Sequence, residues 1–155
     1  MPSTLSQEIR QQKPFKSLHE EAYLSVVRTE TVLRDAFDKV LAAKGLSRVQ
    51  YNILRILRGA GASGLCRHEI GDRLVSRMPD VSRRLDHMEQ AGLISRIRSS
   101  GDRRMVNTTL TPEGLALVNE LDEPVQREFE SKLGHMNDEQ LQSLIDLLGV
   151  ARNVK

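Results

Sequence analysis

The chain has 155 residues and a formal net charge of +2, which suits one compact domain or a small domain with appended helices. Aromatic residues make up only 3%, which argues against a surface that stacks nucleic-acid bases on aromatic rings. The single Cys excludes an internal disulfide and a multi-Cys zinc site. No apolar run approaches the roughly 20 residues of a membrane helix and no signal pattern opens the chain, so we expect a cytoplasmic protein.

Charge is distributed unevenly along the chain. Residues 1–58 hold ten Lys/Arg and six Asp/Glu, residues 59–110 hold nine and six, and residues 111–155 hold four and nine. Every basic residue of the middle block is Arg, whose fork of donors suits phosphates and guanine edges. An ordinary solvated surface has the same composition, so the position of these arginines in the fold must distinguish a nucleic-acid contact from a solvated surface.

Helices are predicted in the first third of the chain. Residues 1–16 are polar and contain two prolines, which is typical of a mobile arm. Residues 17–44 lack Gly and Pro and carry apolar residues at helical spacing, and Gly45 ends this long helix. Ser47 caps a second helix with Gln50 as its capping-box partner. This helix ends at Gly59, and its buried positions are expected to be Tyr51, Leu54 and Leu57, or alternatively Ile53 and Ile56.

A short helix is predicted after the Gly-rich loop at residues 59–64. Cys66 stands in its capping position with Glu69 three residues later, as in a capping box. Ile70 and Leu74 are its apolar pair.

A second short helix follows at once, with Pro79 expected in its first turn, where the missing N–H costs nothing. Val81, Leu85 and Met88 are spaced to face inward, and Gly92 ends the helix. Two short helices joined by a tight turn predict a helix-turn-helix.

A β-hairpin is predicted next. Residues 93–98 lead into a turn rich in Ser, Gly and Asp, and residues 104–110, rich in β-branched side chains, return. Thr111, Pro112 and Glu113 open a further helix, with expected buried positions Leu115, Val118, Leu121 and Val125. The last helix starts at Asn137, and its expected buried positions are Leu141, Leu144, Ile145 and Leu148.

Four motifs stand in this order: PDVSRRLDHME at residues 79–89, GLISR at 92–96, DRR at 102–104 and LTPEG at 110–114. They make the stretch Arg77–Gly114 resemble the DNA-binding half of MarR-family winged helix-turn-helix repressors. The remaining predicted helices fit that family's layout from about Ser17 to Asn153. The chain departs from the family pattern at Arg84, where an apolar or small residue is usual, and at Cys66, where Thr or Ser is more common.

The resemblance implies a mainly α fold with a small β-hairpin wing. Residues 45–110 would form the winged helix-turn-helix, flanked by helical dimerisation regions at residues 17–44 and 111–155. It implies a homodimer that binds a palindromic operator, regulates transcription as a repressor, and is released by a small-molecule effector. Such effectors, often phenolic or anionic, bind between the dimer helices and the DNA-binding lobe. No enzymatic activity, cofactor or metal is implied.

Physical reasoning places the same residues near DNA. A helix fits the major groove and its first two turns reach base edges, so Asp80 could accept from a cytosine amino group and Arg83 could pair with guanine. At the hairpin tip, Arg104 suits a narrow minor groove, and Asp102 can hold its guanidinium. The expected DNA contacts are Arg77, Asp80, Ser82, Arg83, Arg84, Arg96, Arg98, Asp102, Arg103 and Arg104.

Alternative interpretations of these residues stay open. Arg83 and Arg84 could instead form surface salt bridges with Asp80, Asp86 or Glu89, and which Arg reads a base cannot be derived from sequence. Arg96, Arg98 and Arg103 suit either phosphate contacts or a solvated surface.

Cys66 stands at a helix start beside Arg67 and His68, which is a setting found for redox-active thiols. Because the chain has no second Cys to resolve an oxidised form, we favour a simple capping role. His68 and Asp72 share a helix face and could hold a metal, although such a pair is more often a surface contact.

Two other function classes make different predictions. A winged helix that binds protein predicts an exposed apolar patch on the second short helix, where the sequence has Arg and Asp. A non-specific architectural DNA binder predicts a much higher net charge. An enzyme is disfavoured because the loop at residues 59–64 lacks the Lys and Ser/Thr of a nucleotide-binding loop.

Overall fold

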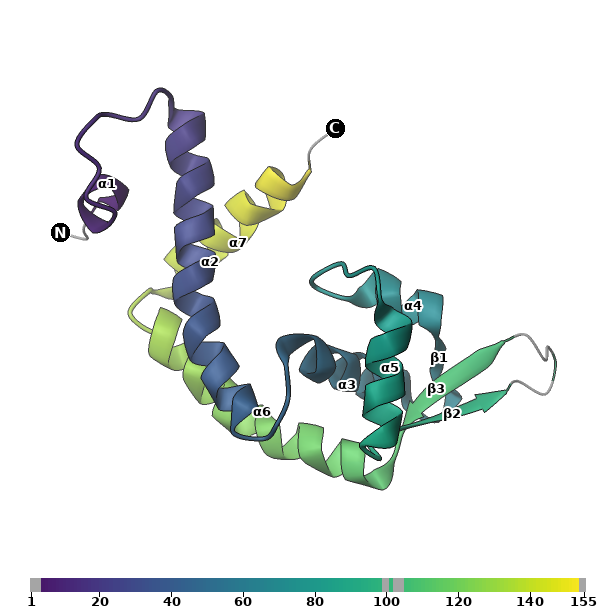
Figure 1. Cartoon of the computed structure of the whole chain (residues 1–155). Coiled ribbons are helices and arrows are strands. Elements are labelled where there is room, and N and C mark those ends of the chain that lie inside the picture. The colour runs from purple at the N-terminus through teal and green to yellow at the C-terminus, as the bar shows by residue number, and fades with distance from the viewer. Residues whose placement is uncertain (1–3, 99–100, 102–104, 154–155) are drawn as a thin grey trace. The chain divides into compact units, whose positions relative to one another are not determined.

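The computed structural model describes residues 4–98, 101 and 105–153 (Figure 1). The chain divides into two compact units, Met1–Lys39 and Val40–Lys155. No helix among the described residues is long and apolar enough to cross a membrane. The elements are α1 (Leu5–Glu8), α2 (Leu18–Ala42), α3 (Arg48–Ala60), a 3-10 turn (Gly61–Ser63), β1 (Leu65–Cys66), α4 (Arg67–Arg73), α5 (Val81–Gln90), β2 (Ile94–Arg98), β3 (Val106–Leu110), α6 (Pro112–Leu133) and α7 (Asp138–Arg152).

The first unit holds α1 and most of α2. The segment expected to be a mobile arm contains the four-residue helix α1, and Glu8 of this helix accepts a hydrogen bond from Arg28 Nε at 3.4 Å. Helix α2 confirms the long helix predicted over residues 17–44. Leu41, in the second unit, is the one buried residue of this helix among those described, while Leu18 and Val26 are 82% and 48% exposed.

The second unit begins with the last turn of α2 and with α3. Gly45 has a φ of +70°, the left-handed conformation that ends a helix at low cost in a glycine. Ser47 and Gln50 form the predicted reciprocal capping box at the start of α3. Helix α3 runs one residue past Gly59 to Ala60. It buries members of both expected sets, namely Tyr51, Ile53, Leu54 and Leu57.

The predicted hairpin is confirmed as part of a three-stranded antiparallel sheet with the order β1-β3-β2. Strands β2 and β3 pair from Ile94 opposite Leu110 to Arg98 opposite Val106. The third strand, β1, pairs Leu65 with Thr108 and Cys66 with Asn107. Sequence reasoning missed β1 because two residues are too few to show an alternating pattern.

The hydrophobic core of the second unit joins the sheet to its helices. Leu54 and Leu57 of α3, Ile70 of α4, Leu85 and Met88 of α5, Ile94 of β2, and Val118 and Leu121 of α6 are each at most 2% exposed. As predicted, the inward positions of α5 are Val81, Leu85 and Met88. The core therefore fixes the orientation of α5, and with it the face that α5 presents to solvent.

Three expectations about burial and boundaries are wrong. Pro79 lies outside α5, because Asp80 is the N-cap and the helix starts at Val81. Leu115 is 42% exposed, and Gly114 takes the inward position instead. No residue of α7 is buried, and its expected core residue Ile145 is 59% exposed. Helical spacing placed Leu115 and Ile145 on apolar faces, but the structure leaves both side chains exposed.

Gly114 allows α6 to approach the start of β2. Thr111 caps α6 by accepting from the Gly114 backbone N–H at 3.1 Å, and the Thr111 N–H donates to the Leu93 carbonyl at 3.1 Å. A Cβ added at Gly114 would lie 2.0 Å from the Leu93 carbonyl oxygen. Since both groups are backbone, neither can move without shifting the helix or the strand.

We expect Gly114→Ala to destabilise the fold by about 2 kcal/mol, the typical cost of forcing an atom into a packed contact. Urea unfolding at a fixed protein concentration measures the effect. Gly59→Ala is the matched control, because nothing lies within 4 Å of a Cβ there and alanine favours the helix by roughly 0.5–1 kcal/mol. Equal stability of the two variants would contradict the close approach.

Candidate nucleic-acid interface

Helix α5 presents a polar face opposite its buried side. Arg83, Asp86, His87 and Gln90 are exposed on this face. None of the exposed large apolar side chains of the described residues lies on α5. The apolar patch that a protein-binding winged helix would need is therefore missing from this helix.

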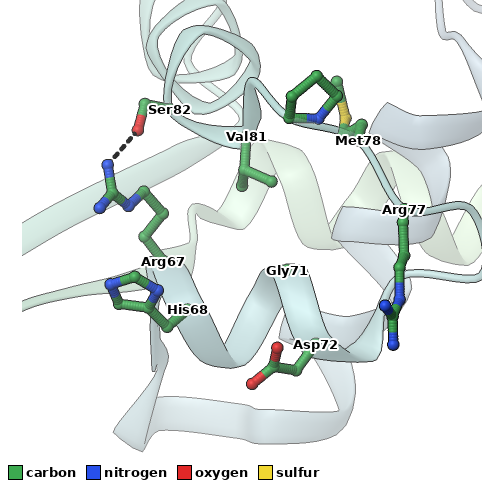
Figure 2. A pocket seen from close by; sticks show the side chains of 9 residues that line it. Arg67, His68, Gly71, Asp72, Arg77, Met78, Val81 and Ser82 are labelled. Carbon is green, nitrogen blue, oxygen red and sulfur yellow. Dashed lines mark hydrogen bonds between the residues drawn. The ribbon is translucent and has the colours of Figure 1, made fainter.

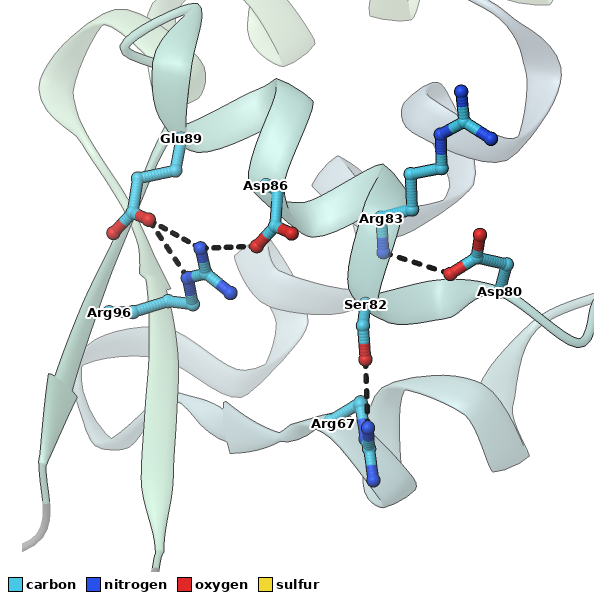
Figure 3. Close-up of polar contacts among 7 residues, drawn as sticks. All are labelled: Arg67, Asp80, Ser82, Arg83, Asp86, Glu89 and Arg96. Carbon is cyan, nitrogen blue, oxygen red and sulfur yellow. Dashed lines mark hydrogen bonds and ion pairs between the residues drawn. The ribbon is translucent and has the colours of Figure 1, made fainter.

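Asp80 is the N-cap of α5, so it precedes the first helical residue, Val81. Its Oδ1 accepts a hydrogen bond from the Arg83 backbone N–H at 3.1 Å, which satisfies one of the free donors at a helix start. This capping role engages one carboxylate oxygen of Asp80. Figure 3 shows the Arg83 guanidinium extending away from this carboxylate.

Arg96 of β2 is held by two carboxylates of α5 (Figure 3). Its Nη2 donates to Asp86 Oδ1 at 2.6 Å and to Glu89 Oε2 at 2.5 Å, and its Nε donates to the same Glu89 oxygen at 3.0 Å. The side chain is only 27% exposed. Arg96 was expected to be a phosphate contact or a solvated residue, and in this structure it ties the hairpin to α5.

Four other predicted DNA-contacting arginines differ from Arg96, because none of them forms an ion pair with an acidic residue that the structure describes. They are Arg77, Arg83, Arg84 and Arg98, and all except the half-buried Arg84 are exposed. The alternative partners considered for Arg83 and Arg84 are otherwise engaged. Asp86 and Glu89 bind Arg96, and Asp80 caps the helix. The positive charge of these side chains is thus left uncompensated by described carboxylates.

Ser82 makes a contact that sequence reasoning missed. Its hydroxyl accepts a hydrogen bond from Arg67 Nη1 of α4 at 2.8 Å. Arg67 is 15 residues away along the chain, so no local pattern links the two. The contact joins the first turns of α4 and α5.

The predicted wing-tip residues Asp102, Arg103 and Arg104 lie outside the described residues. The flanking strands β2 and β3 are described, and Arg98 ends the first of them.

Cys66 caps α4 as predicted. The Glu69 carboxylate accepts from the Cys66 backbone N–H at 2.8 Å, and this hydrogen bond lowers the pKa of Glu69. The thiol is free and half-buried. Among the described residues, no group of three or more His, Cys, Asp and Glu could hold a metal ion.

A helix-turn-helix followed by a β-hairpin, with uncompensated arginines on the second helix, defines a winged-helix DNA-binding protein. The MarR family model matches residues 46–106. The HTH-type transcriptional regulator PecS of Dickeya dadantii (strain 3937) is 32% identical over 149 residues, which cover 95% of this chain and 90% of PecS. The chain belongs to the MarR family, whose members are transcriptional regulators and not enzymes.

Solved structures agree with this assignment. A MarR transcription factor from Planctomyces limnophilus is 37% identical, and the match covers 88% of this chain and 99% of that one with a TM-score of 0.68. NadR, solved in complex with 4-hydroxyphenylacetate, is 25% identical, and the match covers 92% of this chain and all of NadR with a TM-score of 0.71. The predicted fold class, mainly α with a β-hairpin wing, is confirmed.

We expect Arg96→Met to raise the pKa of Glu89 toward its ordinary value, because the Arg96 hydrogen bonds are the main cause of its lowered pKa. A carboxylate with a lowered folded-state pKa stabilises the fold above its unfolded-state pKa and loses this effect as the pH falls through the folded-state pKa. The variant should therefore lose roughly 1 kcal/mol of stability at pH 7, since the pair is partly exposed, and much less at pH 3.

NMR titration of the Glu89 carboxyl carbon and urea unfolding at both pH values measure these effects. Arg127→Met is the control, because Arg127 pairs with Glu123 on the exposed surface of α6 and should leave Glu89 unchanged. A Glu89 pKa that is the same with and without Arg96 would refute the assigned contact.

Proposed function

We propose that this protein is a cytoplasmic, homodimeric repressor that binds a palindromic operator and is released by a small-molecule effector. In this proposal α5 enters the major groove, with Arg83 and Arg84 facing DNA and Arg77 and Arg98 reaching the backbone. Asp102, Arg103 and Arg104 serve the wing, with Arg104 in the minor groove. Arg96 is assigned to positioning α5 against the hairpin.

The observation that carries the proposal is that some arginines at the helix-turn-helix and hairpin are paired with carboxylates and others are not. Arg96 of β2 pairs with Asp86 and Glu89 of α5, where the hairpin meets this helix. Arg83 and Arg84, which also lie on α5, have no acidic partner among the described residues. An uncompensated guanidinium keeps its donors and its charge available to phosphates and guanine edges. A helix used only for protein packing would gain nothing from this arrangement.

The dimer is supported by apolar side chains that the single chain leaves exposed on its terminal helices. In α2 these include Tyr23 at 70% and Val26 at 48%; in α7 they include Ile145, Leu147 and Val150 at 59–71%. Two recognition helices must lie roughly 34 Å apart to enter successive major grooves, so a dimer is the natural unit for a palindromic site. The excess of acidic residues after residue 110 suits a region that faces away from DNA.

The effector is supported by the resemblance and by NadR, which was solved with a phenolic carboxylate. We infer a ligand of that general class, aromatic and anionic, without assigning residues to it.

Fluorescence anisotropy tests the proposed function. The duplex is the DNA upstream of the protein's own coding region, and the comparison is a scrambled duplex of equal length. We expect at least about 10³-fold preference for a palindrome in the upstream duplex and, for about eight neutralised phosphates, a slope of log K against log salt of roughly −7. Equal and steeply salt-dependent binding to both duplexes would favour an architectural role, and absence of binding at low salt would favour a protein partner.

Arg83→Ala and Arg104→Ala should each weaken binding to the palindrome by roughly 1–3 kcal/mol without unfolding the protein. Anisotropy measures the affinity, and circular dichroism melting verifies the fold. Arg127→Ala is the charge-matched control, because Arg127 lies on α6, away from the helix-turn-helix. A double variant of Arg83 and Arg104 that binds like the parent would remove both assignments.

A further inference from the structure

We propose that Arg67 binds a phosphate of the DNA backbone in the pocket between α4 and α5, with Ser82 positioning its guanidinium. Arg67 lies outside the four motifs that carry the family resemblance. The proposal rests on the proposed function and adds a backbone contact from the first helix of the helix-turn-helix.

The pocket has a volume of about 690 Å³ and is lined by α4, by the connection to α5 and by the first turn of α5. Figure 2 shows Arg67 and His68 toward one end and Arg77 toward the other, with Asp72 between them. Arg67, His68 and Arg77 are all exposed. An open pocket with two arginines and one carboxylate in its lining favours an anionic group, and its size admits a phosphate with its sugar.

The positive charge of Arg67 stays available for a ligand because its hydrogen-bond partner, the Ser82 hydroxyl, is neutral. Among the described residues, Arg67 makes no ion pair, and its hydrogen bond goes to the neutral hydroxyl of Ser82. Arg58 shows the opposite arrangement, because both of its Nη atoms donate to the Asp122 carboxylate at 2.8 and 2.9 Å. A guanidinium has five N–H donors, so the bond to Ser82 fixes the orientation of Arg67 and leaves most of its donors free.

The position of Arg67 suits a backbone contact. When the second helix of a helix-turn-helix lies in the major groove, the first helix crosses the sugar-phosphate backbone. Arg67 is the first residue of α4, and Ser82 lies in the first turn of α5. Their hydrogen bond therefore places a guanidinium beside the end of α5 that enters the groove. In this arrangement Ser82 is a positioning residue and not a reader of bases.

Anisotropy titrations of the full-length protein test the proposal. The probe is the duplex that in vitro selection from a random library yields with the wild-type protein, together with a scrambled duplex. Arg67→Ala should weaken binding to both duplexes by a similar factor of about ten, since a phosphate contact carries no sequence information. It should also reduce the salt slope by roughly 0.9 for each protomer. Arg67→Lys should keep most of the slope, and Ser82→Ala should lower affinity less than Arg67→Ala without changing base preference.

A second measurement identifies the phosphate itself. Duplexes that each carry one neutral methylphosphonate are bound by the wild-type protein and by Arg67→Ala. At the contacted phosphate the substitution should cost the wild-type protein about threefold, because it removes one of the two contacts in the dimer, and should cost the variant almost nothing, which is the signature of a coupled pair in a double-mutant cycle. Arg127→Ala should lose affinity at the same positions as the wild-type protein, and melting curves verify that all variants fold.

The outcomes distinguish a failure of the proposed function from a failure of the Arg67 assignment alone. If the wild-type protein does not distinguish the selected duplex from the scrambled one, the proposed function fails and the Arg67 assignment falls with it. If it does distinguish them but Arg67→Ala keeps the parental affinity and slope, or no methylphosphonate position couples to Arg67, only the assignment is overturned. A loss confined to the selected duplex would make Arg67 a base contact and would also overturn it.

Discussion

The contact of Arg96 with Asp86 and Glu89 joins the hairpin to the polar face of α5. It connects β2 to α5 through two carboxylates. Asp86 and Glu89 are thereby engaged by Arg96, while Arg83 and Arg84 have no acidic partner among the described residues. Removing Arg96 would therefore leave two carboxylates of α5 without this partner. The contribution of such a partly exposed ion pair to stability is small.

The structure repeats this division of arginines between scaffold and surface. On the scaffold, Arg58 of α3 pairs with Asp122 of α6 and holds the pKa of that carboxyl below its usual range. At the start of α4, Arg67 meets only a hydroxyl among its described partners. Net charge alone, at +2, does not reveal the difference. The arginines differ in whether they have an acidic partner among the described residues, and this depends on contacts between residues distant in sequence.

The sequence predicted the features of the fold that depend on local chemistry. Capping at Ser47 and Thr111 was predicted correctly, because an N-cap hydrogen bond joins residues only two or three positions apart. The inward face of α5 was correct for the same reason, since its period is set by the helix itself. The hydrogen bond from Arg67 to Ser82 and the short strand β1 could not be predicted, because both depend on segments that tertiary folding brings together.

The wrong burial predictions for α6 and α7 show what helical periodicity leaves undetermined. Helical periodicity identifies which side chains share a face, but it does not identify what covers that face. In α6, the Leu93 carbonyl leaves no room for a Cβ at position 114. Gly114 therefore occupies the inward position, and the next residue, Leu115, is exposed. In α7, Leu147 is 68% exposed on a helix that is otherwise well capped. An amphipathic helix that leaves its apolar residues exposed is stable in water mainly when a further surface packs against it. In the proposed homodimer, a second copy of the chain would supply that surface.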